Sequence, residues 1–472
     1  MKLIFKIIAT FLPILLCSSC SSEGVWEALR NAGSLQKKSG LSENSGTLDV
    51  RFSSDGTADF SVKPELNLAR KIIADSSGRL LITGETNILQ SNTSDMFLIR
   101  LNSDGSLDTS FNSGGATPGV FLHNNAGGGG QSDGGYSVAV DSNGRIIVAG
   151  YSDTDASGTF DTAMTLWRLN DNGTPDTTFN AGSFIYTVST PVDNGNHSAR
   201  ELKIDTDGDY YITGFGRSSG AGNDMVVWRI RPGSGNPSVT WNVADNNAAG
   251  GNADDIGLKL VLSGNAIFVG GSSSRGTFTN ATFWKLQKNN GDLDTAFNSG
   301  GRLSFENLAG GTYSGSDFTA SIETTSSGEF SFSVKSQLNS NFEFRAVTGI
   351  LNSAGSLLTY GNSGLSNVSI PGYMGYAATG GSYESLCGCI ITTGMATSGI
   401  SGIAAMTMLD SNGTLNSDFG AGDGVVLIAG PENFTSIVSV VSTATNYYLA
   451  GYSLDSNTAP TTGKIVIYSL IR

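Results

Sequence analysis

One short phrase recurs along the chain at intervals of about sixty residues, and this repeat constrains the fold more than any other feature. It is clearest at Asn102–Phe111 (NSDGSLDTSF), Asn170–Phe179 and Asp410–Phe419. Weaker copies complete a set with one marker glycine per unit: Gly46, Gly105, Gly173, Gly235, Gly291, Gly355 and Gly413. Their spacings are 59, 68, 62, 56, 64 and 58 residues, and 59 residues follow the last glycine. Seven copies of one unit indicate a repeat architecture.

Each unit has the same order of apolar runs and turns. In the second unit, the alternating segment Tyr136–Val140 leads to the turn Asp141–Gly144, and an apolar run follows at Arg145–Ala149. A third strand at Met164–Leu169, an Asn-Gly turn and a fourth strand near Phe184–Val188 complete the unit. Asn-Gly and Asp-Gly favour tight hairpins, because both central residues can adopt positive φ. Four antiparallel strands per unit are typical of a β-propeller blade.

The composition supports an all-β chain. Glycine supplies 63 of 472 residues, and it costs about 1 kcal/mol per helical position relative to alanine. Hydrophobic residues at 39% suffice for a core. We therefore predict an all-β, seven-bladed β-propeller with four antiparallel strands per blade. The N-terminal strand is expected to complete the last blade, because such closure leaves no open sheet edge.

The charge balance excludes one class of partner. The chain has 27 Lys and Arg against 41 Asp and Glu, a net charge of −14. Binding to a phosphate backbone needs clustered Lys and Arg, and the sequence has no such cluster. We therefore predict no nucleic-acid partner. An acidic surface keeps copies of a molecule apart, so we expect a monomer.

The first residues are predicted to be an export signal. Lys2 and Lys6 precede an apolar run over residues 7–16. This run is shorter than the roughly 20 residues that span a bilayer, and it fits the apolar region of a signal peptide. An ordinary signal peptide would be cut near Ser19 or Ser22.

The alternative to that cut is a lipid anchor at Cys20. Ser18 and Ser19 are the small residues that precede it, although Cys17 stands where leucine is usual. The segment resembles a bacterial lipoprotein signal, which implies removal of residues 1–19 and lipidation of Cys20. We prefer this interpretation, and it places the protein in the bacterial cell envelope, at the outer membrane or cell surface.

Residues 20–45 are predicted to be a flexible tether, and residues 46–472 the propeller. The recurring phrase resembles the delta-60 repeat family across residues 46–472. That resemblance implies an exported bacterial protein with a propeller fold, and it supplies no catalytic residues.

Long, varied loops are expected on one rim, and variable loops on a rigid scaffold are common binding sites. The alternative is that they are only solvated spacers. Two histidines with carboxylates could hold a transition metal, but no ligand spacing is visible, and we interpret them as loop histidines. The candidate binding residues of this rim are His123, Asp133, Asp193, His197, Asp245 and Asp254.

Two further motifs each have two interpretations. Asp205, Asp207 and Asp209 place oxygen ligands at alternate positions, which suits calcium, yet an Asp-initiated hairpin turn explains them equally. Cys387 and Cys389 are predicted to form a disulfide in an exported chain. This bridge is either a staple of the turn or a redox site.

Charged and aromatic residues that recur in each unit are expected to be structural. Arg100, Arg168, Arg229 and Lys285 share one position near the end of the third strand. Aspartates recur after the next turn, and we predict ion-pair rungs between the two sets. Tryptophans just before the basic residues are expected to pack between blades. They are Trp167, Trp228 and Trp284.

These observations favour a binding function over catalysis. We predict a lipid-anchored, extracytoplasmic scaffold that engages a protein or glycan partner through its long-loop rim, without a cofactor. The alternative is an exported hydrolase or lyase with its active site at the mouth of the propeller channel. Fold alone does not choose between them, but the sequence shows no distinctive acid/base or metal constellation.

Overall fold

The computed structural model describes residues 41, 44–64, 66–86, 94–130, 132–155, 161–189, 196–218, 222–246, 248–250, 253–310, 316–338, 343–361, 364–398, 401–455 and 462–472. The predicted signal peptide, Cys20, most of the predicted tether and Asp193 lie outside the described residues. Within the described part, no helix has the length and apolar character needed to cross a membrane.

Five sheets contain four strands each, and every strand pairs antiparallel with the next one in sequence. The first sheet comprises β2 (Asn67–Ala74), β3 (Leu80–Thr86), β4 (Asp95–Leu101) and β5 (Val120–His123). The second comprises β6 (Asp133–Val140), β7 (Ile146–Asp153), β8 (Thr162–Leu169) and β9 (Ile185–Val188). The third comprises β10 (His197–Ile204), β11 (Tyr210–Ser218), β12 (Gly222–Arg231) and β13 (Ser238–Asp245).

The fourth and fifth sheets continue the same order. They comprise β14 (Asp255–Ser263), β15 (Ala266–Arg275), β16 (Phe278–Gln287) and β17 (Arg302–Phe305), followed by β18 (Asp317–Thr324), β19 (Phe330–Gln337), β20 (Phe344–Leu351) and β21 (Leu365–Val368). The remaining strands are β22 (Gly375–Glu384), β23 (Cys389–Ser398), β24 (Ser401–Leu409), β25 (Val425–Ile428), β26 (Phe434–Ser442), β27 (Asn446–Asp455), β28 (Thr462–Ile471) and β1 (Thr57–Phe60).

The prediction of seven separate four-stranded blades is wrong. The structure has five four-stranded blades, and the other eight strands form one sheet. A parallel bridge between Gly402 of β24 and Phe434 of β26 joins its two halves. The Gly402 N–H also donates to the Asn433 carbonyl at 3.2 Å. Gly402 has no side chain to keep the strands apart, and no repeat motif marks this position in the sequence.

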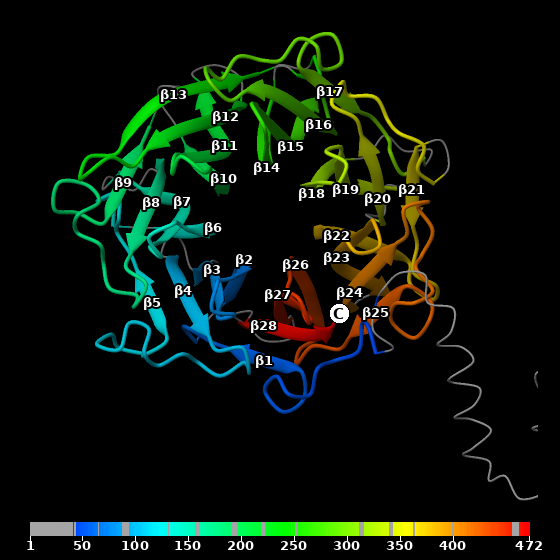
Figure 1. Ribbon diagram of the computed structural model, residues 1–472, viewed down its shortest axis with the longest axis horizontal. Coiled ribbons are helices and arrows are strands. Elements are labelled where there is room, and N and C mark those ends of the chain that lie inside the picture. Colours follow the sequence, from blue (N-terminus) through cyan, green and yellow to red (C-terminus); the bar gives the residue numbers. More distant parts are fainter. Residues whose placement is uncertain are drawn as a thin grey trace, which may run out of the picture.

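The sheets form a ring, and we call the central region enclosed by their innermost strands the channel (Figure 1). The first strand of each unit lies nearest the channel: β2, β6, β10, β14, β18, β22 and β26. The N-terminal strand β1 pairs antiparallel with the C-terminal strand β28, from Thr57–Tyr468 to Phe60–Ile465. Hairpins such as Asp141–Gly144 and the connections from third to fourth strands share one edge of the ring, here the tight-turn rim. The other connections form the long-loop rim.

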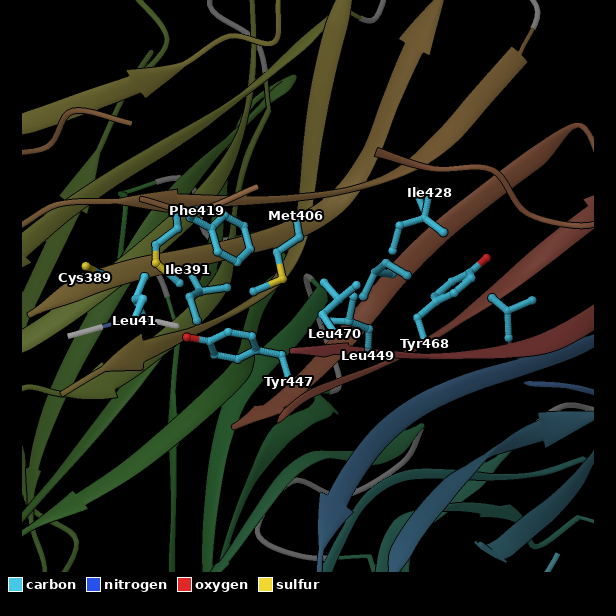
Figure 2. Close-up of a cluster of buried hydrophobic side chains, with 14 residues drawn as sticks. Leu41, Cys389, Ile391, Met406, Phe419, Ile428, Tyr447, Leu449, Tyr468 and Leu470 are labelled. Atoms are coloured by element: carbon cyan, nitrogen blue, oxygen red, sulfur yellow. The ribbon is translucent and has the colours of Figure 1, made fainter. Parts of the chain in front are cut away.

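Apolar side chains pack between neighbouring sheets. One cluster joins Ile147 and Leu166 of the second blade to Ile212 and Trp228 of the third. Figure 2 shows a second cluster within the eight-stranded sheet, where Phe419, Met406 and Tyr447 converge. Trp167, Trp228 and Trp284 are fully buried, which confirms their predicted packing role.

The aromatic residue at the end of the recurring phrase packs against the turn of the next unit. In five units its ring lies against the marker glycine of the following turn, in the pairs Phe52–Gly105, Phe111–Gly173, Trp241–Gly291, Phe297–Gly355 and Phe419–Gly46. In six units, a backbone N–H one or two residues after the recurring aromatic residue donates to a carbonyl in the turn of the following unit. These bonds are Ser53–Asp104, Asn112–Asn172, Ala181–Gly235, Asn298–Ala354, Gly361–Asn412 and Gly420–Ser45, at 2.7–3.0 Å. Four units have both the ring-on-glycine contact and the hydrogen bond, at Phe52, Phe111, Phe297 and Phe419, and we call this combination the clasp.

The last clasp involves the end of the segment predicted to be a tether. The Gly420 N–H donates to the Ser45 carbonyl at 3.0 Å, and Gly46 N–H donates to Ile471 O at 2.8 Å. Leu41 is buried in the cluster shown in Figure 2. Leu41, Ser45 and Gly46, which lie at the boundary between the predicted tether and the propeller, therefore pack on the propeller.

The clasp gives a stability prediction at Gly173. This residue has φ +81°, and a β-carbon there would come within 2.6 Å of the Phe111 ring. We expect Gly173→Ala to lower stability by about 2–4 kcal/mol, the sum of the positive-φ cost and overpacking. Gly144→Ala is the matched control, because Gly144 has φ +76° and nothing within 4 Å of its β-carbon position. Thermal unfolding midpoints measure the difference, and equal losses in both variants would contradict the clasp.

Candidate functional site

The bases of the long rim loops are held by a recurring pair of side chains. Asp133 begins β6, and its carboxylate accepts the backbone N–H groups of Asn125 and Ala126. Ser152 lies near the end of β7, and its hydroxyl oxygen accepts the Gly127 N–H at 2.6 Å. Both side chains are fully buried. The loop that leads into the blade is therefore capped at its base.

Two more blades repeat this arrangement. Asp255 accepts the Ala248 N–H at 3.3 Å, and Asp317 accepts the Leu308 N–H at 3.4 Å. Their serine counterparts are Ser273, which accepts from Ala249, and Ser336, which accepts from Ala309. We call Asp133–Ser152, Asp255–Ser273 and Asp317–Ser336 the loop-base pairs. Asp133 thus has a structural role that the sequence analysis did not foresee.

Burial changes the ionisation of two of these aspartates. It raises the pKa of Asp133 to about 6, against opposing hydrogen bonds from Ser152 and the loop backbone. It raises the pKa of Asp317 to about 6 in the same way. Both carboxyls are therefore partly protonated below neutral pH.

His123 and Asp245 share a second structural role, at the ends of the outer strands β5 and β13. Trp167 Nε1 of the next blade donates to His123 Nδ1 at 3.3 Å. Trp284 Nε1 donates to Asp245 at 2.6 Å, and Arg302 also binds this carboxylate. Burial lowers the pKa of His123, which keeps Nδ1 available as an acceptor. These residues link neighbouring blades.

The other predicted rim residues also have local roles. His197 begins β10 at the position that Asp133 has in β6, and it is 1% exposed. Asp254 accepts the Asn223 N–H at 2.8 Å. Across the described residues, no group of three or more His, Cys, Asp or Glu side chains could hold a metal ion.

The residues of the calcium hypothesis are oriented toward protein cations. Asp205 accepts the N–H groups of Asp207 and Asp209 at 2.9 Å, as expected for a turn, and Lys288 lies 2.9 Å from its other oxygen. The Asp209 carboxylate contacts Arg229 and Arg231. The turn interpretation accounts for the backbone contacts of Asp205, and protein cations occupy the outer oxygens of Asp205 and Asp209.

The recurring charges form the predicted rungs in three units. Arg100–Asp108, Arg168–Asp176 and Lys285–Asp294 are joined at 2.7, 2.8 and 2.9 Å. Arg229 departs from the prediction, because it pairs with Asp209.

The two cysteines at the turn between β22 and β23 are joined by a disulfide. The turn is also held by Glu384, which accepts the Leu386 N–H at 3.1 Å. Arg472 and Tyr447 bind the same carboxylate. The staple and redox interpretations of Cys387 and Cys389 both stay predictions.

The channel contains a cluster of charges that sequence reasoning missed. Lys71 of β2 lies 2.8 Å from Glu201 of β10, and Lys203 lies 3.5 Å from the same oxygen. The second blade stands between β2 and β10 along the ring (Figure 1), so the Lys71–Glu201 pair joins two blades that are not neighbours. Lys259 and Glu323 line the same cavity. Its volume of about 30 Å³ holds only one or two water molecules.

Charge interactions and burial shift the pKa values of Glu201 and Lys259 in this cluster. Burial by itself would raise the pKa of Glu201, but Lys71, Lys203 and Lys259 outweigh it and lower the pKa to about 2. Burial lowers the pKa of Lys259 to about 8. The sequence did contain a signal for this charged cluster, because the first strand of several units carries a charged residue.

A second cluster of side chains comes from β-bulges in the innermost strands. Arg70, Tyr136 and Arg200 are each the extra residue where the register shifts in their strands. The Arg200 guanidinium stacks 3.9 Å above the Tyr136 ring. Glu85 binds Arg70 at 2.8 Å and Tyr151 at 2.9 Å. Bulges re-aim side chains, and here they bring these three toward one another.

Sequence comparison connects two units to a known family model. The model described as a domain of unknown function (DUF5122) β-propeller matches residues 76–111 and 142–179. The matches end at the recurring aromatic residues Phe111 and Phe179. The matches span less than a fifth of the chain and agree with a β-propeller. No curated protein is similar enough in sequence to count as a relative.

Several solved structures resemble the chain in shape. They include the β-propeller domain of the Trilobed protease from Pyrococcus furiosus, with 9% identity, coverage of 86% of this chain and 94% of that chain, and a TM-score of 0.43. Polysaccharide lyase Uly1 has 13% identity, coverage of 87% and 91%, and a TM-score of 0.48. Chaetomium thermophilum Sqt1 bound to the N-terminus of ribosomal protein L10 has 9% identity, coverage of 88% and 98%, and a TM-score of 0.42. At these identities and scores, they do not indicate what this chain binds.

The loop-base aspartates predict a pH effect. Their folded pKa of about 6 exceeds the unfolded value of about 3.9. Their stabilising contribution is therefore complete below about pH 4 and is lost as pH rises through about 6. We expect Asp133→Asn/Asp317→Asn to gain several degrees of unfolding temperature relative to wild type between pH 4.5 and 7.5. Asp207→Asn, at an exposed site, is the control and should parallel wild type. A difference from wild type that does not change with pH would contradict the raised pKa values.

Proposed function

We propose that this chain is a non-catalytic, lipid-anchored extracytoplasmic propeller that binds a protein or glycan partner through its long-loop rim. The observation that carries the proposal is the set of loop-base pairs. Each pair fixes the base of a long loop while the loop itself varies in length and sequence between blades. Fixed bases under variable loops suit a binding surface, because less loop motion must be frozen on binding.

The channel cluster supports the binding interpretation over the hydrolase or lyase alternative. A carboxylate pair that works on a sugar needs space for the sugar between the two groups. Glu201 is instead bound by Lys71 and Lys203, and the adjoining cavity is only about 30 Å³.

The anchor and the location rest on the sequence. The apolar run and Cys20 support an exported lipoprotein, and the recurring phrase supports membership of the delta-60 repeat family. Two or more acyl chains give stable membrane attachment, whereas one binds reversibly. A lipid-anchored propeller would display its rim to partners in the cell envelope.

The anchor is tested by Cys20→Ala. We expect the variant to move from the membrane fraction to the soluble fraction, because its lipid attachment site is gone. Fractionation with detergent phase partition measures this, and Cys17→Ala is the control that should keep membrane attachment. Unchanged partition of Cys20→Ala would contradict the anchor.

The binding rim is tested by photo-crosslinking from two exposed hydrophobic positions. Met374 lies on the long-loop rim and is 59% exposed, whereas Val50 lies on the tight-turn rim and is 65% exposed. A photoreactive amino acid at Met374 should give a discrete adduct with an envelope protein or glycan, and one at Val50 should not. Mass spectrometry identifies the adduct. Absence of adducts at Met374, or equal adducts from both positions, would contradict the proposal.

A further inference from the structure

The seven innermost strands carry one equivalent residue each, just after a β-bulge. In every one of these strands the pairing with the next strand shifts register at the same point. The long, charged members of this set come from β2, β10 and β14, whereas the consecutive strands β18, β22 and β26 supply only small ones. The seven residues are Lys71, Ser137, Glu201, Lys259, Ser321, Gly380 and Ser439.

The small members of the set leave a cavity opposite the charged ones. Every member except Ser137 lines it, and Lys203 and Glu323 line it as well. Gly380 is kept small by its surroundings, because a β-carbon there would come within 2.7 Å of the Val438 carbonyl oxygen. The cavity volume of about 30 Å³ is enough for one or two water molecules.

The Lys259 ammonium is the cation of this lining that lacks an acidic partner. Lys71 and Lys203 lie 2.8 and 3.5 Å from the same Glu201 oxygen. Lys259 is half-buried and forms no ion pair or hydrogen bond with the described residues. An ammonium that is withdrawn from bulk water without a partner is costly.

The formal charges of the lining leave an excess of one positive charge. Three lysines, Lys71, Lys203 and Lys259, face two carboxylates, those of Glu201 and Glu323. This excess lies inside a chain whose net charge is −14. From the unpaired ammonium, the charge excess and the size of the cavity together, we propose that the cavity binds a monatomic anion, chloride, beside Lys259.

Chloride fits this cavity in both size and charge. It is close to a water molecule in size, whereas carboxylates and phosphates are larger, and one chloride balances the excess positive charge. Burial lowers the pKa of Lys259 to about 8. A bound anion favours the ammonium form and therefore opposes this effect of burial.

Other polar groups of the lining can complete the contacts of the anion. The Ser439 hydroxyl oxygen accepts the Ile72 N–H at 3.3 Å, which leaves the hydroxyl proton to donate. Glu201 Oε2 has no hydrogen-bond partner among the described residues, and a water molecule between it and the anion would donate to both. The site lies in the channel and uses none of the rim loops, so it does not depend on the proposed function.

The test compares thermal unfolding of the full-length protein in sodium chloride and in sodium gluconate at equal sodium concentrations. Gluconate is too large to enter a cavity of this size. A ligand that binds only the folded protein raises the unfolding midpoint as its concentration rises. We expect chloride to raise the midpoint by about 2–4 °C with saturation, relative to gluconate.

Bromide locates the site directly. It replaces chloride at most chloride sites and has an anomalous scattering signal in crystals. Crystals of the wild-type protein soaked in sodium bromide should show an anomalous peak inside the cavity, next to Lys259 Nζ. This measurement does not depend on the folding of any variant.

Two matched variants connect the effect to Lys259. Lys259→Met removes the charge and keeps an unbranched side chain, and it should abolish the chloride dependence of the midpoint. The variant should fold, because Glu201 keeps both Lys71 and Lys203. Lys335→Met is the control. Lys335 is also half-buried and forms no ion pair with the described residues, but it stacks on Phe344 at 4.7 Å, outside the cavity lining. This control should keep the chloride dependence.

Three results would overturn the proposal. The first is an equal unfolding midpoint in chloride and in gluconate, as expected if the cavity holds only water. The second is the absence of a bromide peak from the cavity. The third is a chloride dependence that persists in Lys259→Met or is lost equally in Lys335→Met.

Discussion

The contact between an aromatic ring and a glycine of the next turn is the interaction on which the rest of this propeller depends. Phe111 can lie on the turn of the next unit only because Gly173 has no side chain and adopts positive φ. The adjoining hydrogen bond, Asn112 N–H to Asn172 O at 2.7 Å, fixes the distance between the two units. Repetition of this contact sets the spacing of the sheets, and that spacing creates the channel, the rims and the pockets between blades.

Much of the local structure could be predicted from the sequence, because hairpins and rungs are made by residues close together in the chain. Arg100 and Asp108 are eight residues apart, and their pair was foreseen. The fusion of two units through Gly402 and Phe434 was not, since a single bridge has no sequence motif. The roles of His123 and Asp245 were missed for a similar reason. Each accepts a hydrogen bond from a tryptophan of the next blade, and only the assembled ring brings those residues together.

The repeats also show how one position can have different partners in neighbouring units. Arg100 donates to the backbone carbonyl of Asp171, whereas Arg168 lies against the Tyr210 hydroxyl of the next unit. The channel charges pair over a longer distance. Lys71 and Glu201 come from different blades and neutralise each other, which stabilises the ring but removes space for chemistry.

The pairing of β1 with β28 has a consequence for how the chain is made. Thr57 must pair with Tyr468, more than four hundred residues later in the chain, before the eight-stranded sheet is complete. Contacts so distant in sequence form slowly, because the intervening chain must be ordered first. The ring therefore cannot close until β28 has been made. Until then β1 presents an unpaired edge, which can pair with another chain and lead to aggregation.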